Sequence, residues 1–236
     1  MSRAVQSVLD RYAEGVPCAE LAAAFREHRR WTGDDPRLLL AEAAASTTGQ
    51  RFLGGVKPTV ERFREAFVAT DRVASFADIA ALDLEDDDLV AAFGAQRKRR
   101  VLLEAAGVLS ARPEADDPAA LLGWAETADH YRYDEDPIGA IAGVGPSTFQ
   151  FLRQLAGVET LTPDPTAVAL IDAVADALES SPLDTGTDLR TIASGEWLAV
   201  ESSYSALEID RLAWWTFTDA DDREAVLAVH ESATKR

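Results

Sequence analysis

Helical spacing of apolar residues is the feature that most limits what this chain can fold into. In nearly every segment, apolar side chains recur three or four residues apart, as they do on the buried face of an amphipathic helix. No segment shows the strict alternation of a half-buried strand. The pattern predicts helices over residues 4–12, 18–28, 37–47, 59–69, 76–82, 89–93, 96–109, 118–128, 165–179, 201–217 and 221–233. We therefore predict an all-α protein.

Length and composition place the chain among globular proteins. Its 236 residues, 47% of them hydrophobic, suffice for one large domain or two small ones with a proper core. No apolar run approaches the ~20 residues of a membrane span, and residues 1–6 lack the apolar core of a signal peptide. We therefore expect a soluble cytoplasmic protein without a membrane partner.

Cofactor chemistry finds little support in the sequence. Cys18 is the only cysteine, which excludes an intrachain disulfide, a multi-thiolate zinc site and a four-cysteine iron–sulfur cluster. The three histidines lack ligand spacing, so no metal site is expected. The sequence also lacks a phosphate-binding Walker loop, a dinucleotide fingerprint and a Ser-His-Asp arrangement. We expect neither a metal nor a nucleotide cofactor.

The charge balance argues against a nucleic-acid partner at first sight. Twenty-three basic and 41 acidic residues give a net charge of -18, whereas nucleic-acid-binding domains are usually basic. The acidic residues cluster at 83–88 and 114–117, in expected loops or helix starts. Such a composition is typical of a halophilic protein, because salt near 1 M screens charges beyond ~3 Å. In that setting, backbone amides and stacking must contribute more to DNA binding than counterion release does.

A glycine-rich turn interrupts the helical pattern between residues 138 and 156. Gly143 and Gly145 flank Val144 where the chain must reverse tightly, and Pro146 suits the first turn of the next helix. Glycine permits positive φ angles that leave backbone N–H groups pointing outward, and a helix N-terminus attracts anions. The turn is therefore a candidate phosphate-binding hairpin.

A single carboxylate follows this hairpin. A loop over residues 157–163 delivers Asp164 to the start of the predicted helix 165–179. An aspartate before a proline at a helix start is commonly an N-cap, so Asp164 has a structural explanation as well as a catalytic one. The two roles are compatible. By the same reasoning, Asp35-Pro36 should begin the helix 37–47, and Asp117 should cap the helix that contains Pro118.

Together these segments resemble the helix-hairpin-helix superfamily of DNA base-excision glycosylases, with an endonuclease III-like fold but no iron–sulfur cluster. The resemblance rests on Ala142-Gly-Val-Gly-Pro-Ser-Thr148 followed by Thr162-Pro-Asp164, and it extends from about residue 38 to 217. It implies one region over residues 1–236 built of two intertwined helical lobes. The first lobe would span about 37–130, and the second about 1–36 plus 131–236, with the hairpin at 138–156 and the aspartate loop at 157–166.

The resemblance also assigns roles to residues. Asp164 would be catalytic, stabilising positive charge on the sugar or activating water beside a flipped nucleotide. The DNA-binding set would comprise Gly143, Val144, Gly145, Ser147, Thr148, Lys98 and, as the side chain that fills the gap left by the base, Gln50. Tyr131, Tyr133, Trp31 and Trp124 are candidates for stacking on the flipped base. The sequence is equally compatible with Lys98 lying on a solvated helix face. It is equally compatible with Gln50 lying in an ordinary surface turn.

One departure from the family narrows the expected chemistry. Relatives that also cleave the backbone carry a Schiff-base lysine in or just after the hairpin, whereas this chain has Pro146-Ser147-Thr148. The expected partner is double-stranded DNA with a damaged base. We expect the protein to be a monomer that hydrolyses the bond between the base and the sugar without cutting the strand. The alternative is a non-catalytic helix-hairpin-helix module that binds DNA or protein.

Overall fold

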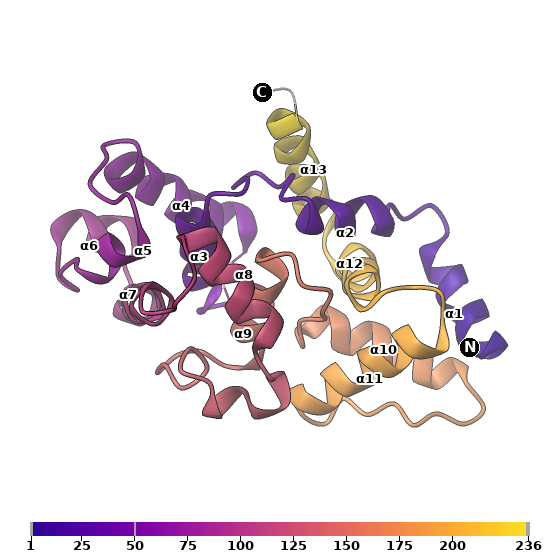
Figure 1. The fold of residues 1–236 in the computed structure, drawn as a ribbon. Helices are drawn as coiled ribbons and strands as arrows, with labels where there is room; N and C mark the ends of the chain where they lie inside the picture. Colours follow the sequence, from indigo (N-terminus) through magenta and orange to yellow (C-terminus); the bar gives the residue numbers. More distant parts are fainter. Residues whose placement is uncertain (1, 50, 235–236) are drawn as a thin grey trace. The chain divides into compact units, whose positions relative to one another are not determined.

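The structure is a computed structural model that describes residues 2–49 and 51–234, with side chains described up to residue 228. Among the described residues every regular element is a helix, which confirms the prediction of an all-α protein. The α-helices are α1 (Arg3–Ala13), α2 (Cys18–Arg26), α3 (Pro36–Ser46), α4 (Lys57–Phe63), α5 (Phe76–Ala80), α6 (Asp87–Phe93), α7 (Gln96–Ser110), α8 (Asp117–Thr127), α9 (Pro146–Leu155), α10 (Pro165–Ala177), α11 (Asp188–Glu201), α12 (Ala206–Phe217) and α13 (Ala220–Thr234) (Figure 1). Two short π-helical segments, η1 (Phe52–Val56) and η2 (Arg64–Val68), flank α4, and a 3₁₀ segment, η3 (His130–Glu135), follows α8. None of the helices traced in these two ranges combines the length and the apolar composition that crossing a membrane requires.

The chain divides into two compact units. Unit 1 combines residues 1–31 with 157–236, and unit 2 is the continuous stretch 32–156. A discontinuous unit built from both ends of the chain was predicted, but its boundaries differ from the expected ones. Residues 131–156, including the hairpin, belong to the continuous unit rather than to the discontinuous one.

Unit 2 is organised around α3. Every residue from Leu38 to Ala45 is buried, so this helix has no solvent face and must lie at the centre of its unit. It packs against α4, α7 and α9, and α7 in turn packs closely against α5. The alanines of α3 allow this crowding, because small side chains let neighbouring helices approach.

Unit 1 has a core that draws on both ends of the chain. Its buried apolar cluster comprises Val5, Val8, Leu9, Cys18, Leu161, Ala167, Leu170, Ile171, Val174, Leu198, Ile209, Leu212 and Ala213. These residues come from α1, α2, α10, α11 and α12 together with the loop before α10. Burial of this set ties the N-terminal helices to the C-terminal half, at about 25 cal/mol for each Å² of apolar surface removed from water.

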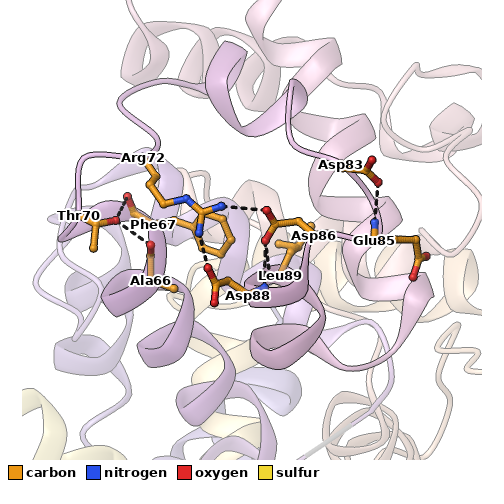
Figure 2. Close-up of polar contacts among 9 residues, drawn as sticks. All are labelled: Ala66, Phe67, Thr70, Arg72, Asp83, Glu85, Asp86, Asp88 and Leu89. Atoms are coloured by element: carbon orange, nitrogen blue, oxygen red, sulfur yellow. Dashed lines mark hydrogen bonds and ion pairs between the residues drawn. The ribbon is translucent and has the colours of Figure 1, made fainter.

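The acidic segment 83–88 has a structural role within unit 2. Figure 2 shows Arg72 lying between two carboxylates, with Nη2 2.9 Å from Asp86 Oδ2 and Nη1 2.5 Å from Asp88 Oδ2. The same guanidinium lies 4.4 Å above the ring centre of Phe67. Asp86 also caps α6 by accepting from the amides of Asp88 and Leu89. Backbone donors and Arg72 together lower the pKa of the Asp86 carboxyl.

Two predicted details are wrong. Residues 201–217 do not form one helix: α11 ends at Glu201, and α12 begins after Ser205, which forms a capping box with Glu208. The cap of α8 is Asp116, whose carboxylate accepts from Ala119 N at 2.9 Å. Asp117 instead accepts from Phe76 N at 2.7 Å, and so connects α8 to the start of α5.

Candidate functional site

Asp164 lies at the N-terminus of α10 in unit 1, held between two buried apolar residues. Leu161, three residues before it, and Ala167, three residues after it, are each 1% exposed. The carboxylate caps the helix, because Oδ1 accepts from Thr166 N at 2.8 Å, Ala167 N at 2.9 Å and Thr166 Oγ1 at 2.7 Å. The predicted N-cap is thus confirmed. All three bonds reach Oδ1, and no residue in the described part of the chain donates to Oδ2.

A second Asp-Pro cap, at the start of α3, shows that this arrangement is not a general consequence of capping. Asp35 caps α3 and accepts from Arg37 N at 3.0 Å, as predicted. Arg37 then binds both oxygens, with Nε 2.9 Å from Oδ1 and Nη2 2.7 Å from Oδ2. Of these two similar caps, only Asp164 keeps a carboxylate oxygen without a described partner.

A second carboxylate, Asp210 of α12, supports the loop before Asp164. Its Oδ1 accepts from Thr162 N at 2.7 Å, and its Oδ2 accepts from Arg211 Nε at 2.8 Å. Asp210 is only 3% exposed. Burial raises the pKa of the Asp210 carboxyl, and the nearby charge of Asp164 raises it further, while Arg211 opposes both effects. Asp164 and Asp210 of α12 are therefore two carboxylates in electrostatic contact, one half-buried and one buried.

The start of the same loop is fixed to α2. Arg26 Nη1 lies 2.5 Å from Glu159 Oε1 in a half-exposed ion pair. Leu161 packs closely on α11, since a Cβ added to Gly195 would lie 2.7 Å from Leu161 Cδ1. Residues 160–163 are buried. Such anchoring at both ends limits the movement of Asp164, and a fixed position is what a catalytic carboxylate needs.

The predicted hairpin lies in unit 2, where turns over residues 137–143 precede α9. Before it, a single helical turn forms, in which Ala140 N donates to Asp136 O at 2.8 Å. Gly143 has φ +111°, whereas Gly145, at φ −121°, has an ordinary extended conformation. The expected need for glycine thus applies to Gly143 alone. Gly143 is also crowded, because a Cβ there would lie 2.8 Å from Cγ and Nε of Arg97.

Only some of the hairpin amides are free to bind a phosphate. Val144 N donates to Ile141 O at 2.9 Å and is therefore occupied. Gly145 caps α9 without a side-chain hydrogen bond, and the amides of Gly145 and Thr148 donate to no residue in the described ranges. The Ser147 backbone and side chain are half-buried next to them. Arg97 contacts this turn through Nη2, which donates to Gly143 O at 2.8 Å.

The basic run at residues 97–100 is divided among separate tasks. Arg97 holds the hairpin, Arg99 donates to Leu84 O and pairs with Glu85, and Arg100 lies 3.8 Å from Glu104. Lys98 is 2% exposed, so its ammonium does not lie on a solvated helix face. Burial, and secondarily the charge of Arg62, lower the pKa of Lys98. The solvated helix face that the sequence also allowed for Lys98 is therefore wrong, and its contact with DNA stays a prediction.

The aromatic candidates differ in their exposure. Trp124 is 2% exposed, donates from Nε1 to Asp136 Oδ1 at 3.1 Å and packs edge-on against Phe149. We therefore remove Trp124 from the stacking candidates. Tyr131, on η3, is 44% exposed, and Tyr133 is half-buried against Phe149. Trp31, in unit 1, is also half-buried. Gln50, the predicted gap-filling residue, lies outside the described residues.

Comparison with known proteins adds nothing to this geometry, because no family model, no curated protein and no solved structure matches the chain.

Two supporting residues were not predicted from the sequence. Asp210 follows Leu207 by three residues and precedes Ala213 by three, so it falls on the apolar face of α12. A charged residue within an apolar stripe is the signal that would have identified it. Arg97 offers no comparable signal, because its contact with the hairpin joins residues 46 apart in the sequence.

Proposed function

We propose that this chain is a monofunctional DNA glycosylase of the helix-hairpin-helix type, which hydrolyses the N-glycosidic bond of a flipped, damaged base. The proposal joins the sequence resemblance to one structural observation. Asp164 is fixed through Oδ1 by three hydrogen bonds, while Oδ2 has no partner in the described part of the chain. A rigid carboxylate with one open oxygen is suited to an electrostatic or general-base role.

In the proposed reaction, Oδ2 of Asp164 faces the sugar of the extruded nucleotide. As the glycosidic bond breaks, the carboxylate stabilises the positive charge that develops on the sugar, or it accepts a proton from the attacking water. The amides of Thr166 and Ala167 remain bound to Oδ1 throughout, so the carboxylate need not reorient. Preorganised groups of this kind avoid reorganisation during the reaction.

The hairpin would hold the DNA backbone. The free amides of Gly145 and Thr148 are at the N-terminus of the ten-residue helix α9, where the helix dipole favours an anion. Binding through backbone amides suits a protein with a net charge of -18, since it requires no cluster of surface cations.

The absence of a hairpin lysine limits the products. Pro146, Ser147 and Thr148 provide no amine that could form a Schiff base with the sugar. The expected product is therefore free base plus an abasic site in an intact strand.

The test is base release from duplexes that carry uracil, an alkylated purine or oxidised guanine, each in high and low salt, with an abasic duplex as reference. We expect the wild-type chain to release base from at least one duplex without nicking it. Asp164→Asn should reduce release by about 10²-fold or more, because a positioned acid–base group contributes 10²–10⁴-fold. DNA affinity should change little. Asp35→Asn is the matched control, because it alters a similar Asp-Pro cap, at the start of α3, and should leave release unchanged.

The acidic charge favours a second candidate function, a helix-hairpin-helix module that binds DNA or a protein without catalysis. In that case the wild-type chain would release no base from any duplex. In a gel-shift assay it would bind the duplexes if its partner is DNA, and none of them if its partner is a protein. Equal activity of the Asp164→Asn variant and the wild-type chain would remove Asp164 from the mechanism.

A further inference from the structure

A cavity of about 290 Å³ lies within unit 2, apart from Asp164 and the hairpin. Five short segments form it: η1, α4, the end of α6, the turn that follows and the first turn of α7. Its lining residues are Gly54, Gly55, Pro58, Thr59, Arg62, Ala91, Phe93, Gly94, Ala95 and Lys98.

The cavity has a buried base and an exposed rim. Gly55, Thr59, Phe93 and Lys98 are buried, whereas Gly54, Arg62, Ala91, Gly94 and Ala95 are exposed. A ligand can therefore enter from solvent and reach a charged group that is itself removed from bulk water. Interactions with such a group are stronger than those at the protein surface, because the local dielectric constant is lower.

The charge of the lining is opposite to that of the chain. Arg62 and Lys98 are cationic, and none of the described residues that line the cavity carries a carboxylate. Acidic residues outnumber basic ones by 41 to 23 in the chain as a whole, whereas the reverse holds for this lining. The positive cavity is thus a local exception in an anionic molecule.

The two cations are held in place although they repel each other. Arg62 is anchored through Ala92 O, to which Nη2 donates at 2.9 Å and Nε at 3.2 Å. Lys98 is fixed by burial on α7, and the repulsion from Arg62 contributes to its lowered pKa. An anion between two like charges converts this repulsion into attraction, and charge-assisted hydrogen bonds to it are stronger than neutral ones.

We propose that this cavity is a binding site for a phosphate group. Lys98 supplies a compact charge at the base, and Arg62 supplies a second charge at the rim, where Nη1 donates to no described residue. The Thr59 hydroxyl accepts from Arg62 Nη2 at 3.4 Å and keeps its own hydrogen to donate. At Gly54 and Gly94 a Cβ would meet no atom within 4 Å, so these glycines leave room for the oxygens to approach the backbone. The volume is at the small end of ligand pockets, about 300–1,000 Å³, so a single phosphate with a small attachment fits better than a large ligand.

The phosphate group has two possible sources, the backbone of DNA or a free phosphorylated molecule. Inorganic phosphate is the probe for both. We would titrate it into the wild-type chain by calorimetry at constant ionic strength, with chloride and sulfate as reference anions. We expect saturable binding of one phosphate per chain, tighter than that of either reference anion.

Paired variants locate the binding. Arg62→Gln should weaken phosphate binding by about tenfold or more, since a hydrogen bond to a charged group contributes 1.4 kcal/mol or more. Arg100→Gln removes the same charge from unit 2 but outside the cavity, and it should retain the wild-type affinity within about twofold. Gly54→Glu and Gly54→Gln form a second pair in case loss of the Arg62 anchor perturbs folding. A side chain at Gly54 meets no atom within 4 Å, and only the glutamate should abolish binding through its charge.

Three results would overturn the proposal: phosphate binding no tighter than chloride binding, equal losses in Arg62→Gln and Arg100→Gln, or equal binding by the two Gly54 variants. The source follows from a repeat titration with short duplex DNA present. If the duplex removes the phosphate isotherm and itself binds Arg62→Gln more weakly, the group is a backbone phosphate. An unchanged isotherm assigns the cavity to a small phosphorylated molecule. Asp164→Asn should bind phosphate normally, so failure of the glycosylase proposal would leave this one standing.

Discussion

Asp164 and Asp35 both precede a proline and both cap a helix, yet their surroundings give them different chemistry. Asp35 is neutralised by Arg37, which binds both of its oxygens. No cation among the described residues binds Asp164, which instead lies near a second carboxylate, Asp210. A cap needs only one oxygen, so the carboxylate without a cation is the one that can act on a substrate.

Asp210 makes the stability of unit 1 depend on pH in a direction that can be tested. Its folded pKa lies above the ordinary value of 3.8 because of burial. The folded state therefore prefers the protonated form, and Asp210 costs stability as pH rises through 3.8 toward the folded pKa. Asparagine at this position can still accept the Thr162 amide and cannot ionise.

We therefore expect the stability of Asp210→Asn, relative to the wild-type chain, to improve as pH rises from about 3.8 and to level off above the folded pKa of Asp210. Denaturant unfolding of both chains at a series of pH values measures this difference. A difference that is flat with pH, or that worsens toward neutral pH, would contradict a raised pKa for Asp210.

Gly143 is the hairpin residue that we expect to tolerate substitution least. Its φ of +111° is costly for any other residue, and a Cβ would overlap the Arg97 side chain at 2.8 Å. Gly143→Ala should cost about 1–3 kcal/mol of stability. Gly145→Ala is the control, because this position has φ −121° and no atom within 4 Å of a Cβ. Thermal unfolding compares the two variants, and equal losses would show that hairpin strain at Gly143 is not the cause.

At this scale the sequence predicts roles that depend on neighbours along the chain. The Asp164 cap and the helix start at Asp35-Pro36 were predicted because the aspartate, the proline and the bonded amides lie within three residues. Asp210 and the burial of Lys98 were not, because each depends on helices that come together only in the folded unit. The contact between Arg97 and Gly143 was not predicted for the same reason, since it joins residues that are far apart in the sequence.

At the scale of the elements, the sequence predicted which segments are helical better than it predicted where each helix begins and ends. Residues 201–217 have a continuous apolar period, which predicted one helix across Ser202–Ser205. The structure instead ends α11 at Glu201 and restarts at Ala206, because Ser205 and Glu208 form a reciprocal cap. Periodicity alone does not locate such a break, whereas the Ser-x-x-Glu spacing does.

Removing the cap of α12 should lower the stability of the protein by a measurable amount. Ser205 Oγ accepts from Glu208 N at 3.2 Å, and Glu208 Oε2 accepts from Ser205 N at 2.8 Å. Ser205→Ala should therefore destabilise the protein by about 1 kcal/mol. Ser7→Ala, in the exposed middle of α1, should instead be neutral or slightly stabilising, because alanine has the higher helix propensity. Urea unfolding of the two variants checks the sign of each effect, and a neutral Ser205→Ala would show that the box contributes nothing.

At the scale of the whole molecule, the acidic surface sets two opposing effects of salt. Part of the negative charge stabilises local structure, as Asp86 and Asp88 do around Arg72. Added salt weakens such pairs, but exposed pairs contribute only about 0–1 kcal/mol each. The net charge of -18 generates repulsion over the entire molecule, which salt also screens. Because 41 acidic residues face only 23 basic ones, a net charge of -18 remains even when every Lys and Arg forms one ion pair, so the repulsive effect should dominate.

We therefore expect the melting temperature to rise between about 0.1 and 1 M KCl, where the Debye length falls from about 10 to 3 Å. Sucrose at matched osmolality is the control, since it favours burial without screening charge.

The affinity for DNA should depend on salt for the same reason, the screening of charge repulsion. A conventional basic interface loses affinity steeply with salt, at about 0.9 logarithmic units per phosphate neutralised. When the contact is made by backbone amides on an anionic protein, the DNA affinity should fall little or even rise as salt is added. Salt screens the repulsion between protein and DNA, and few counterions are released on binding. A steep loss of affinity would show instead that surface cations carry the binding, and it would remove the hairpin amides as the main contact.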